Sequence, residues 1–149
     1  MNRTLFFALS ILSSLSLFTA LRSVHAADPR QFVKLPAPMQ KHMLGNMRDH
    51  LLALSEIQSA LAAGKFEQAS AIAEHRIGMS SLQIHGASHM APFMPQAMRT
   101  IGTEMHRAAS RFAIAASDAA TTNNVRPALT QLSHITQQCV ACHSTYRIR

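Results

Sequence analysis

The apolar positions of residues 27–149 follow a helical period almost throughout. Apolar side chains recur three and four residues apart, and Gly and Pro stand where such runs stop. Almost no segment alternates apolar and polar residues as a strand does. Four helices are therefore predicted: one from Pro36 or Pro38 to Gly64, one from about Lys65 to Gly78, one from about Gln96 to Ala119, and one that Asn123 or Asn124 caps. Short connections between them favour an all-α fold, an antiparallel up-down-up-down four-helix bundle.

The third predicted helix has the most regular apolar face. Its apolar residues keep spacings of three and four: Met98, Ile101, Met105, Ala108, Phe112 and Ala115. That spacing is typical of the seam between antiparallel helices. His106 follows Met105 and is expected to face solvent. The fourth helix should bury a face that leads to the C-terminal cysteines: Val125, Leu129, Leu132, Ile135 and Cys139.

The segment between the second and third helices, 79–95, has a looser pattern that Gly and Pro interrupt. Leu82 and Ile84 suggest that the second helix continues partway into it. His and Met side chains gather from 85 to 98, where His85 begins a His-x3-His spacing. These soft ligands leave open whether the segment binds a second metal, such as copper.

The first 26 residues have the pattern of a secretory signal peptide. Arg3 gives a short basic start, an uncharged apolar run follows from Leu5 to Phe18, and Val24-His25-Ala26 offers small residues for cleavage after Ala26. An uncleaved membrane anchor is the alternative, but the run is shorter than the ~20 residues that span a bilayer. We therefore expect an exported, periplasmic protein of residues 27–149, a single domain with no stable membrane span.

The chain is basic, with 14 Lys and Arg residues against 7 Asp and Glu and a net charge of +7. Loss of residues 1–26 removes two arginines and leaves a net charge of +5. The basic residues are scattered singly, and without a dense patch they argue against nucleic acid as a partner. The positive charge instead favours docking to an acidic redox partner protein. No Ser-His-Asp arrangement, carboxylate pair or glycine-rich phosphate loop supports a hydrolase or a nucleotide enzyme.

The strongest chemical signal is the motif Cys139-Val140-Ala141-Cys142-His143. Its C-x-x-C-H spacing is the one that covalent haem attachment requires. On a helix the three residues stand at i, i+3 and i+4 and share a face, so two thiols can bond the haem vinyl groups while the imidazole reaches the iron. A disulfide between cysteines one turn apart has poor geometry and would constrain almost nothing. A redox-active C-x-x-C pair usually follows a strand, and no strand pattern precedes this one.

A single C-x-x-C-H motif near the C-terminus of a four-helix bundle, followed by an aromatic residue and Arg, resembles the class II c-type cytochromes. That family contains cytochrome c′ and its low-spin, methionine-ligated relatives. The resemblance implies one haem c, bound covalently through Cys139 and Cys142, with His143 as the proximal ligand of the iron. It implies that Arg147 is a charged neighbour that tunes this imidazole. Tyr146 matches the aromatic position and is expected to be a packing residue.

The resemblance places the sixth iron ligand on the first helix, where Met43 matches the methionine-ligated type. A thioether opposite histidine raises the reduction potential and keeps the iron six-coordinate. Met39 and Met47, one turn to either side, and His50, two turns on, remain alternatives, as do ordinary packing of Met43 and an open site. Two features depart from the family: Met39 stands where an arginine is often found, and the chain has no tryptophan.

These observations predict a periplasmic monohaem cytochrome c that transfers one electron between protein partners and is not an enzyme. Binding of nitric oxide or carbon monoxide at a five-coordinate, cytochrome c′-like iron is the alternative. A third hypothesis is a metal-handling protein in which His and Met side chains bind copper and the haem is only structural. Relatives in the family are often homodimers, and the sequence leaves open whether this chain forms one.

Overall fold

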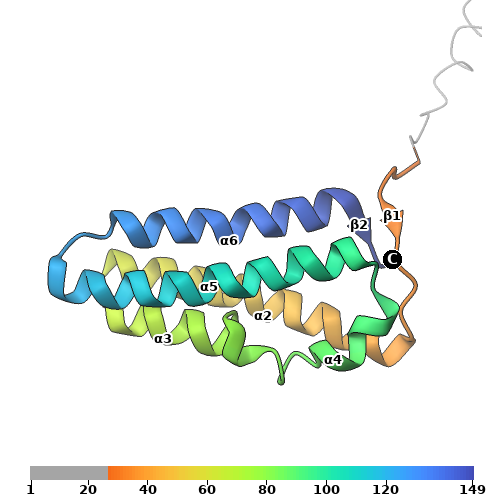
Figure 1. The fold of residues 1–149 in the computed structure, drawn as a ribbon, viewed down its shortest axis with the longest axis horizontal. Coiled ribbons are helices and arrows are strands. Elements are labelled where there is room, and N and C mark those ends of the chain that lie inside the picture. The colour runs from red at the N-terminus through yellow and green to blue at the C-terminus, as the bar shows by residue number, and fades with distance from the viewer. Residues whose placement is uncertain (1–26) are drawn as a thin grey trace, which may run out of the picture.

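The computed structural model describes residues 27–149, and the predicted signal peptide, 1–26, lies outside the described residues. The described part is mostly helical, which confirms the all-α class (Figure 1). The elements in chain order are β1 (Gln31–Phe32), α2 (Ala37–Ala62), α3 (Phe66–Arg76), a 3-10 turn (Met79–Ser81), α4 (Ala87–Met90), a second 3-10 turn (Ala91–Phe93), α5 (Gln96–Thr122), α6 (Arg126–Thr145) and β2 (Tyr146–Arg147).

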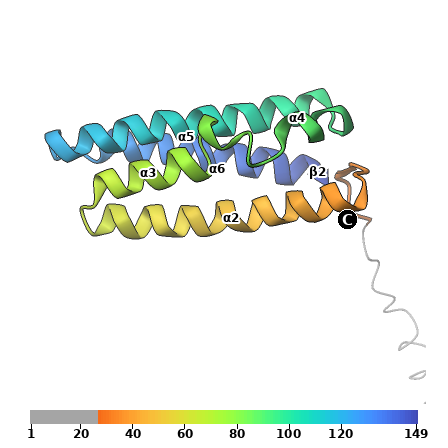
Figure 2. The same cartoon turned by 90° about the horizontal axis from the view of Figure 1, so that it is seen from below.

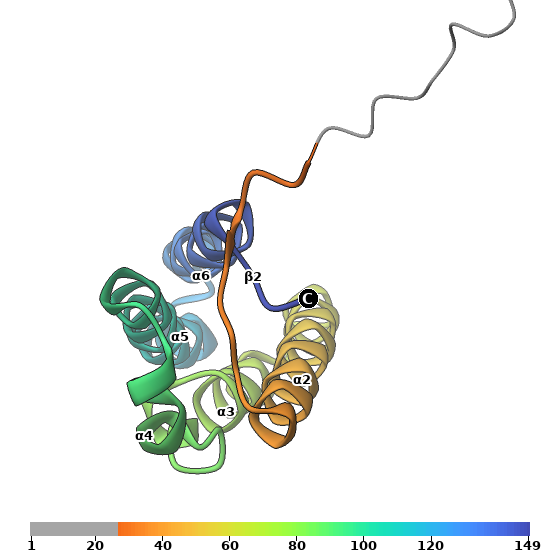
Figure 3. The ribbon, with the colours of Figure 1, turned by 90° about the vertical axis from the view of Figure 1, so that its right-hand side faces the viewer.

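The long helices pack in the order α6, α5, α3, α2. Consecutive long helices run in opposite directions, and the α2–α3 and α5–α6 turns lie at the same end of the molecule (Figure 2). Seen end-on, this row curves so that α2 and α6 stand across from each other, and the segment from β1 to α2 crosses between them (Figure 3). The opposite end of the molecule from the two turns therefore gathers both ends of the described chain.

The larger core cluster is built mainly from alanines, which let the helices approach closely. The predicted face of α5 is confirmed, because four of its six residues are buried and the other two are half-buried. Phe112, fully buried, is the largest side chain in the cluster. The buried members are Ala53, Ile57, Ala60, Ala69, Ala73, Ile77, Met105, Ala108, Ala109, Phe112, Ala113, Ala116, Ala128 and Ile135.

Helix α2 begins and ends close to the positions that the proline and glycine residues in the sequence predict. Pro36 precedes its first turn, and Gly64 follows its last turn with a φ of 67°. The N–H of Lys65 donates to the carbonyl of Ala60 at 2.8 Å, which satisfies one of the free carbonyls at the helix end. Glycine takes this left-handed backbone without the steric cost of a Cβ.

Replacing Gly64 with alanine is expected to lower the free energy of unfolding by about 1 kcal/mol. The cost comes from the positive φ alone, because a Cβ there would meet no atom within 4 Å. Gly102, inside α5, has equally open surroundings, so Gly102→Ala should raise the free energy of unfolding by about 0.5–1 kcal/mol. Chemical denaturation of both variants measures the contrast, and changes of the same sign would contradict it.

Helix α3 stops at Arg76, so the predicted continuation through Leu82 and Ile84 is wrong. The two N–H groups after Arg76 both bond the carbonyl of Ala73, at 2.9 and 2.8 Å, which closes the helix. Ile84 is 74% exposed, so its apolar side chain does not mark a buried helical face.

The start of α6 and one residue of its predicted buried face, Leu129, differ from the prediction. The other four residues of that face pack in the larger core cluster as expected. Asn123 takes a left-handed φ of 56° and ends α5. The N-cap position of α6 is held by Val125 and not by either asparagine. Asn124 still contributes, because its side-chain oxygen accepts from the N–H of Arg126 at 3.2 Å. Leu129 is 49% exposed, whereas Ala128 is fully buried. The small side chain at 128 lets α6 lie against α5, and the larger leucine turns toward solvent.

A short parallel pairing of β1 with β2 adds an element that the apolar pattern did not predict. Gln31 aligns with Tyr146 and Phe32 with Arg147, and the N–H of Val33 donates to the carbonyl of Arg147 at 2.8 Å. Two residues are too few for a period-two pattern to be visible. The pairing fixes the segment before α2 against the end of α6.

Candidate functional site

Both cysteines of the C-x-x-C-H motif lie in the last two turns of α6. Cys139 and Cys142 are half-buried free thiols. Burial raises the pKa of both thiols, and the neighbouring Cys139 adds to the effect on Cys142. The two side chains are therefore neutral near pH 7, one helical turn apart, and face the protein rather than bulk water.

The two thiols contact different parts of the core. Cys139 packs against the larger, alanine-rich cluster. Cys142 packs against a second apolar cluster, here called the methionine cluster. Its buried members are Val33, Leu35, Met43, Met90, Met98 and Tyr146, and its partly buried ones are Met39, Met47, Met94, Ile101, Cys142 and Ile148.

The methionine cluster brings Met43 of α2 together with Cys142 of α6. Met43 is only 6% exposed, whereas Met39 and Met47 are partly buried at the margin of the cluster. Gln40 of α2 also donates its side-chain N–H to the carbonyl of Ile148. Residues far apart in the sequence thus meet at one end of the molecule, and the role of Met43 as an iron ligand stays a prediction.

Tyr146 is a packing residue, as predicted. Its side chain is 7% exposed and belongs to the methionine cluster. It begins β2, directly after the last turn of α6. The aromatic ring therefore covers the cluster beside Cys142.

The side chain of His143 lies outside this cluster. The residue is exposed, at the end of α6, where adjacent helical residues point about 100° apart. Its backbone carbonyl accepts a hydrogen bond from Arg30 Nη1 at 3.2 Å. The structure thus groups Met43 with Cys142 and leaves the His143 imidazole on the solvent side of the same helix end.

Arg147 interacts with the N-terminal segment. Its guanidinium lies over the Phe32 ring, 5.1 Å from the centroid, and its Nε is 3.8 Å from Asp28 Oδ2. That Nε is buried and makes no hydrogen bond. Hydrogen bonds from Arg30 lower the pKa of Asp28 to about 2, so this carboxylate stays charged beside both arginines. Asp28 and Arg30 carried no motif, and only the β1–β2 pairing brings them to the end of α6.

Three histidines form a second polar feature inside the apolar core. His50 of α2, His85 and His106 of α5 are each at most 8% exposed. Their ring centroids are 4.7 Å apart for His50 and His85, 5.4 Å for His85 and His106, and 6.0 Å for His50 and His106. The expectation that His106 faces solvent is wrong. Buried alanines three and seven positions later, Ala109 and Ala113, place it on a core-facing stripe.

The buried histidines are neutral near pH 7. Burial lowers the pKa of His50 to about 4, and the neighbouring His85 and His106 lower it further than Asp49 raises it. Burial is also the main cause that lowers the pKa values of His85 and His106. This residue set was missed as a group because its members come from three separate segments of the chain.

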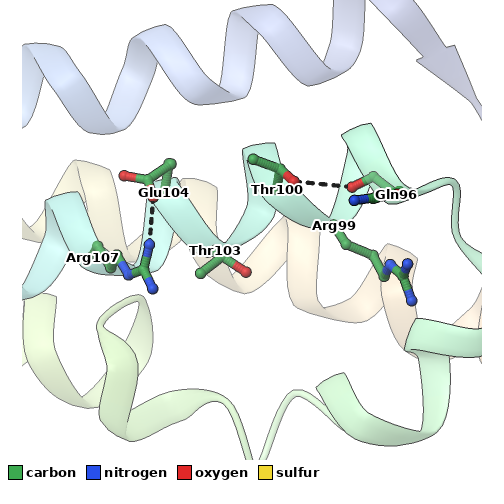
Figure 4. Close-up of a pocket in the computed structure, with 6 residues that line it drawn as sticks. All are labelled: Gln96, Arg99, Thr100, Thr103, Glu104 and Arg107. Atoms are coloured by element: carbon green, nitrogen blue, oxygen red, sulfur yellow. Dashed lines mark hydrogen bonds and ion pairs between the residues drawn. The ribbon is translucent and has the colours of Figure 1, made fainter.

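Two hollows in the surface lie away from the cysteine motif. A shallow pocket of about 210 Å³ runs along α5, where Glu104 pairs with Arg107 at 2.6 Å (Figure 4). A second recess, of about 510 Å³, lies between α3 and α5 around Ser70 and Ser117. Neither hollow is lined by Cys139, Cys142 or Met43, so neither belongs to the candidate site at the methionine cluster.

Within residues 27–149, no three or more His, Cys, Asp or Glu side chains are arranged to bind a metal ion. No helix in this part of the chain has the length and apolar character needed to cross a membrane. Comparisons of the chain with protein-family models, with curated proteins and with solved structures gave no match.

Proposed function

We propose that this protein is an exported monohaem c-type cytochrome that carries single electrons, built as an antiparallel up-down-up-down four-helix bundle. The observation that supports it most is the packing of Cys142 and Met43, from opposite ends of the sequence, in one apolar cluster. Bound haem c would supply a one-electron iron couple whose potential depends on its axial ligands and surroundings.

The residues at the end of α6 suit covalent attachment of haem. Cys139 and Cys142 are free, half-buried and one turn apart, so each is placed to form one thioether bond from the same helix face. The His143 imidazole is exposed and is free to turn toward a group bound beside the two thiols. His143 and the buried thioether of Met43 are the two residues that would hold the iron.

The surroundings of Met43 favour electron transfer over gas binding. The side chain is enclosed by apolar neighbours, which exclude water, and its uncharged thioether belongs to the same cluster as Cys142. A methionine that held the iron would keep small ligands away from it and would favour its reduced state. A five-coordinate, cytochrome c′-like protein is the alternative outcome of the spectroscopic test below.

The partner we propose is an acidic periplasmic redox protein. Exposed basic residues flank the methionine cluster in the sequence: Lys34 lies between Val33 and Leu35, Lys41 precedes Met43, and Arg149 follows Ile148. Exposed basic residues next to members of the cluster would attract an acidic partner and speed its encounter at low ionic strength. Electron exchange that slows as salt is added is the signature of this docking mode.

The full chain, exported together with the haem-attachment machinery, should retain one haem per polypeptide after denaturation. Absorption spectra are expected to show low-spin iron in both oxidation states, with a methionine–iron charge-transfer band when oxidised and no change when carbon monoxide is added to the reduced protein. Cys139→Ala with Cys142→Ala should lose all covalent haem. A five-coordinate spectrum with rapid carbon monoxide binding would support the gas-binding alternative, and a chain without haem would overturn both.

A further inference from the structure

The three buried histidines, His50, His85 and His106, lie outside the methionine cluster and have no part in the proposed electron transfer. His50 follows Met43 by seven residues, which is about 10 Å along the axis of α2. The rings come from α2, from the segment after the first 3-10 turn, and from α5, so three parts of the chain must fold to bring them together.

Hydrogen bonds fix which nitrogen of two of these rings is free. His106 Nδ1 is 2.5 Å from the carbonyl of Ile77, which can only accept, so Nδ1 carries the proton. Ser81 donates its single hydroxyl proton to the carbonyl of Gly78 at 2.7 Å, and its oxygen is 3.2 Å from His85 Nδ1. That oxygen must then accept from His85 Nδ1–H. In both neutral imidazoles the lone pair is therefore on Nε2.

The third ring has a nitrogen without any partner. His50 is 94% buried, and its Nε2 is enclosed with no hydrogen-bond partner in the described part of the chain. An unpaired buried polar atom is costly, and native proteins rarely leave one without a reason. The unpaired Nε2 of His50 thus lies in the same histidine cluster as two rings whose lone pair is on Nε2.

The spacing of the rings fits three imidazoles around one metal ion. A metal–nitrogen bond of about 2.0 Å places the ring centre about 3.2 Å from the metal, and tetrahedral angles then separate the ring centres by about 5.2 Å. The observed separations, 4.7, 5.4 and 6.0 Å, bracket that value. The rings as they stand do not direct three donor atoms at one point. Turning a ring about its Cβ–Cγ bond moves its nitrogens and leaves its centre almost in place, and this torsion is soft.

We propose that Nε2 atoms of His50, His85 and His106 bind one divalent transition-metal ion, Zn²⁺ or Cu²⁺, after the His50 ring turns toward the other two. Neutral imidazoles suit both ions. The bonds from His85 and His106 to Ser81 and to a backbone carbonyl are the outer contacts that metal-binding histidines commonly make.

Charged groups beside the cluster are arranged to tolerate an added cation. Asp49, next to His50 on α2, pairs with Arg76 at 2.5 Å, and Arg76 also pairs with Glu56. These two carboxylates and one guanidinium leave one net negative charge at the edge of the site. Because Asp49 is engaged by Arg76, a water molecule rather than this carboxylate would complete a tetrahedral set.

The proposal is tested on the haem-loaded, exported protein by titration with Zn²⁺ and, separately, with Cu²⁺. We expect one equivalent of either ion to bind, with at least a tenfold loss of affinity in His50→Gln and in His85→Gln. His75→Gln and His89→Gln are matched controls, because both residues are exposed, and they should leave that equivalent unchanged. Loss of binding in the controls alone, or no bound equivalent of either ion, would overturn the site.

Two further measurements keep the test independent of any folding defect in the variants. The electron paramagnetic resonance spectrum of the unmutated protein with one equivalent of Cu²⁺ should show coupling to three imidazole nitrogens. Ser81→Ala retains all three imidazoles and should weaken binding severalfold, because His85 loses the contact that orients it. Coupling to fewer than three nitrogens would contradict the assignment, whether or not haem is attached.

Discussion

In the haem-loaded protein that we propose, replacing Met43 with alanine is expected to convert low-spin iron into high-spin iron. The oxidised protein should lose its methionine–iron charge-transfer band, and the reduced protein should bind carbon monoxide stoichiometrically. The reduction potential should fall by a sizeable part of the ~0.8 V range that axial ligands span. Met43 is 6% exposed, so its truncation should also cost about 2–5 kcal/mol of folding stability, which circular dichroism and denaturation measure separately.

Met47→Ala is the matched control for this prediction. Met47 lies one turn further along α2 and is partly buried against the same cluster. Its truncation should lower stability and leave the spectrum, the potential and the response to carbon monoxide as they were. If the spectrum changed in Met47→Ala and not in Met43→Ala, the iron ligand would be Met47, one turn further along α2, in place of Met43. If neither variant changes it, the iron has no methionine ligand from this part of α2.

Acid is expected to destabilise the metal-free protein well above the pH at which carboxylates titrate. In the folded state burial lowers the pKa of His50 from 6.5 to about 4 and also lowers the pKa values of His85 and His106. Unfolded histidines bind protons below about pH 6.5, whereas these three buried histidines bind them only at lower pH. The stability is therefore complete above that pH and falls as the pH drops toward 4. His50 alone accounts for about 3 kcal/mol of this loss.

Urea denaturation between pH 7 and pH 5 measures this slope, which is about 1.4 kcal/mol per pH unit for each proton taken up. The charged groups around the rings, Asp49, Arg76 and His42, do not change its sign, because burial is the largest cause of the shifts. His50→Gln should lower this slope by the contribution of one proton, because one buried imidazole is lost. The lowered pKa values of Asp49 and Glu74 act only below about pH 4.5, so they do not overlap this window. A stability that stays constant from pH 7 to pH 5 would contradict the neutral histidine cluster.

The helices could be predicted because their signals are local. Pro36 and Gly64 mark the ends of α2, and the apolar spacing of α5 appears in the core as expected. Predictions failed where one small residue decided the packing. Leu129 has the stronger apolar signal, yet Ala128 is buried, because close approach of two helices selects for a small side chain. The β1–β2 pairing depends on contacts between the two ends of the described chain, which no local pattern reveals.

The candidate site divides in the same way. The positions of Cys139, Cys142 and Met43 on helices could be predicted, because the periodic segments that carry them are helical. Their roles at a haem stay predictions from spacing and resemblance. The burial of His106 could not be predicted, because its core-facing stripe consists of alanines, whose apolar signal is weak. The grouping of His50 with His85 and His106 depends on how α2 and α5 pack around the segment between Gly78 and Gly86. Gly86 takes a φ of 63° in this segment, which glycine adopts without steric cost, and a Cβ there would lie 3.3 Å from His42 Nε2.

The two ends of the described chain meet at the methionine cluster, and the turns at Gly64 and Asn124 lie at the far end of the molecule (Figure 1). An affinity tag or electrode linker fused at either chain end would therefore stand beside the surface where we propose that partners dock. A linker inserted into the turn between α2 and α3 would leave that surface open. For immobilised measurements of electron exchange, this turn is the preferred point of attachment.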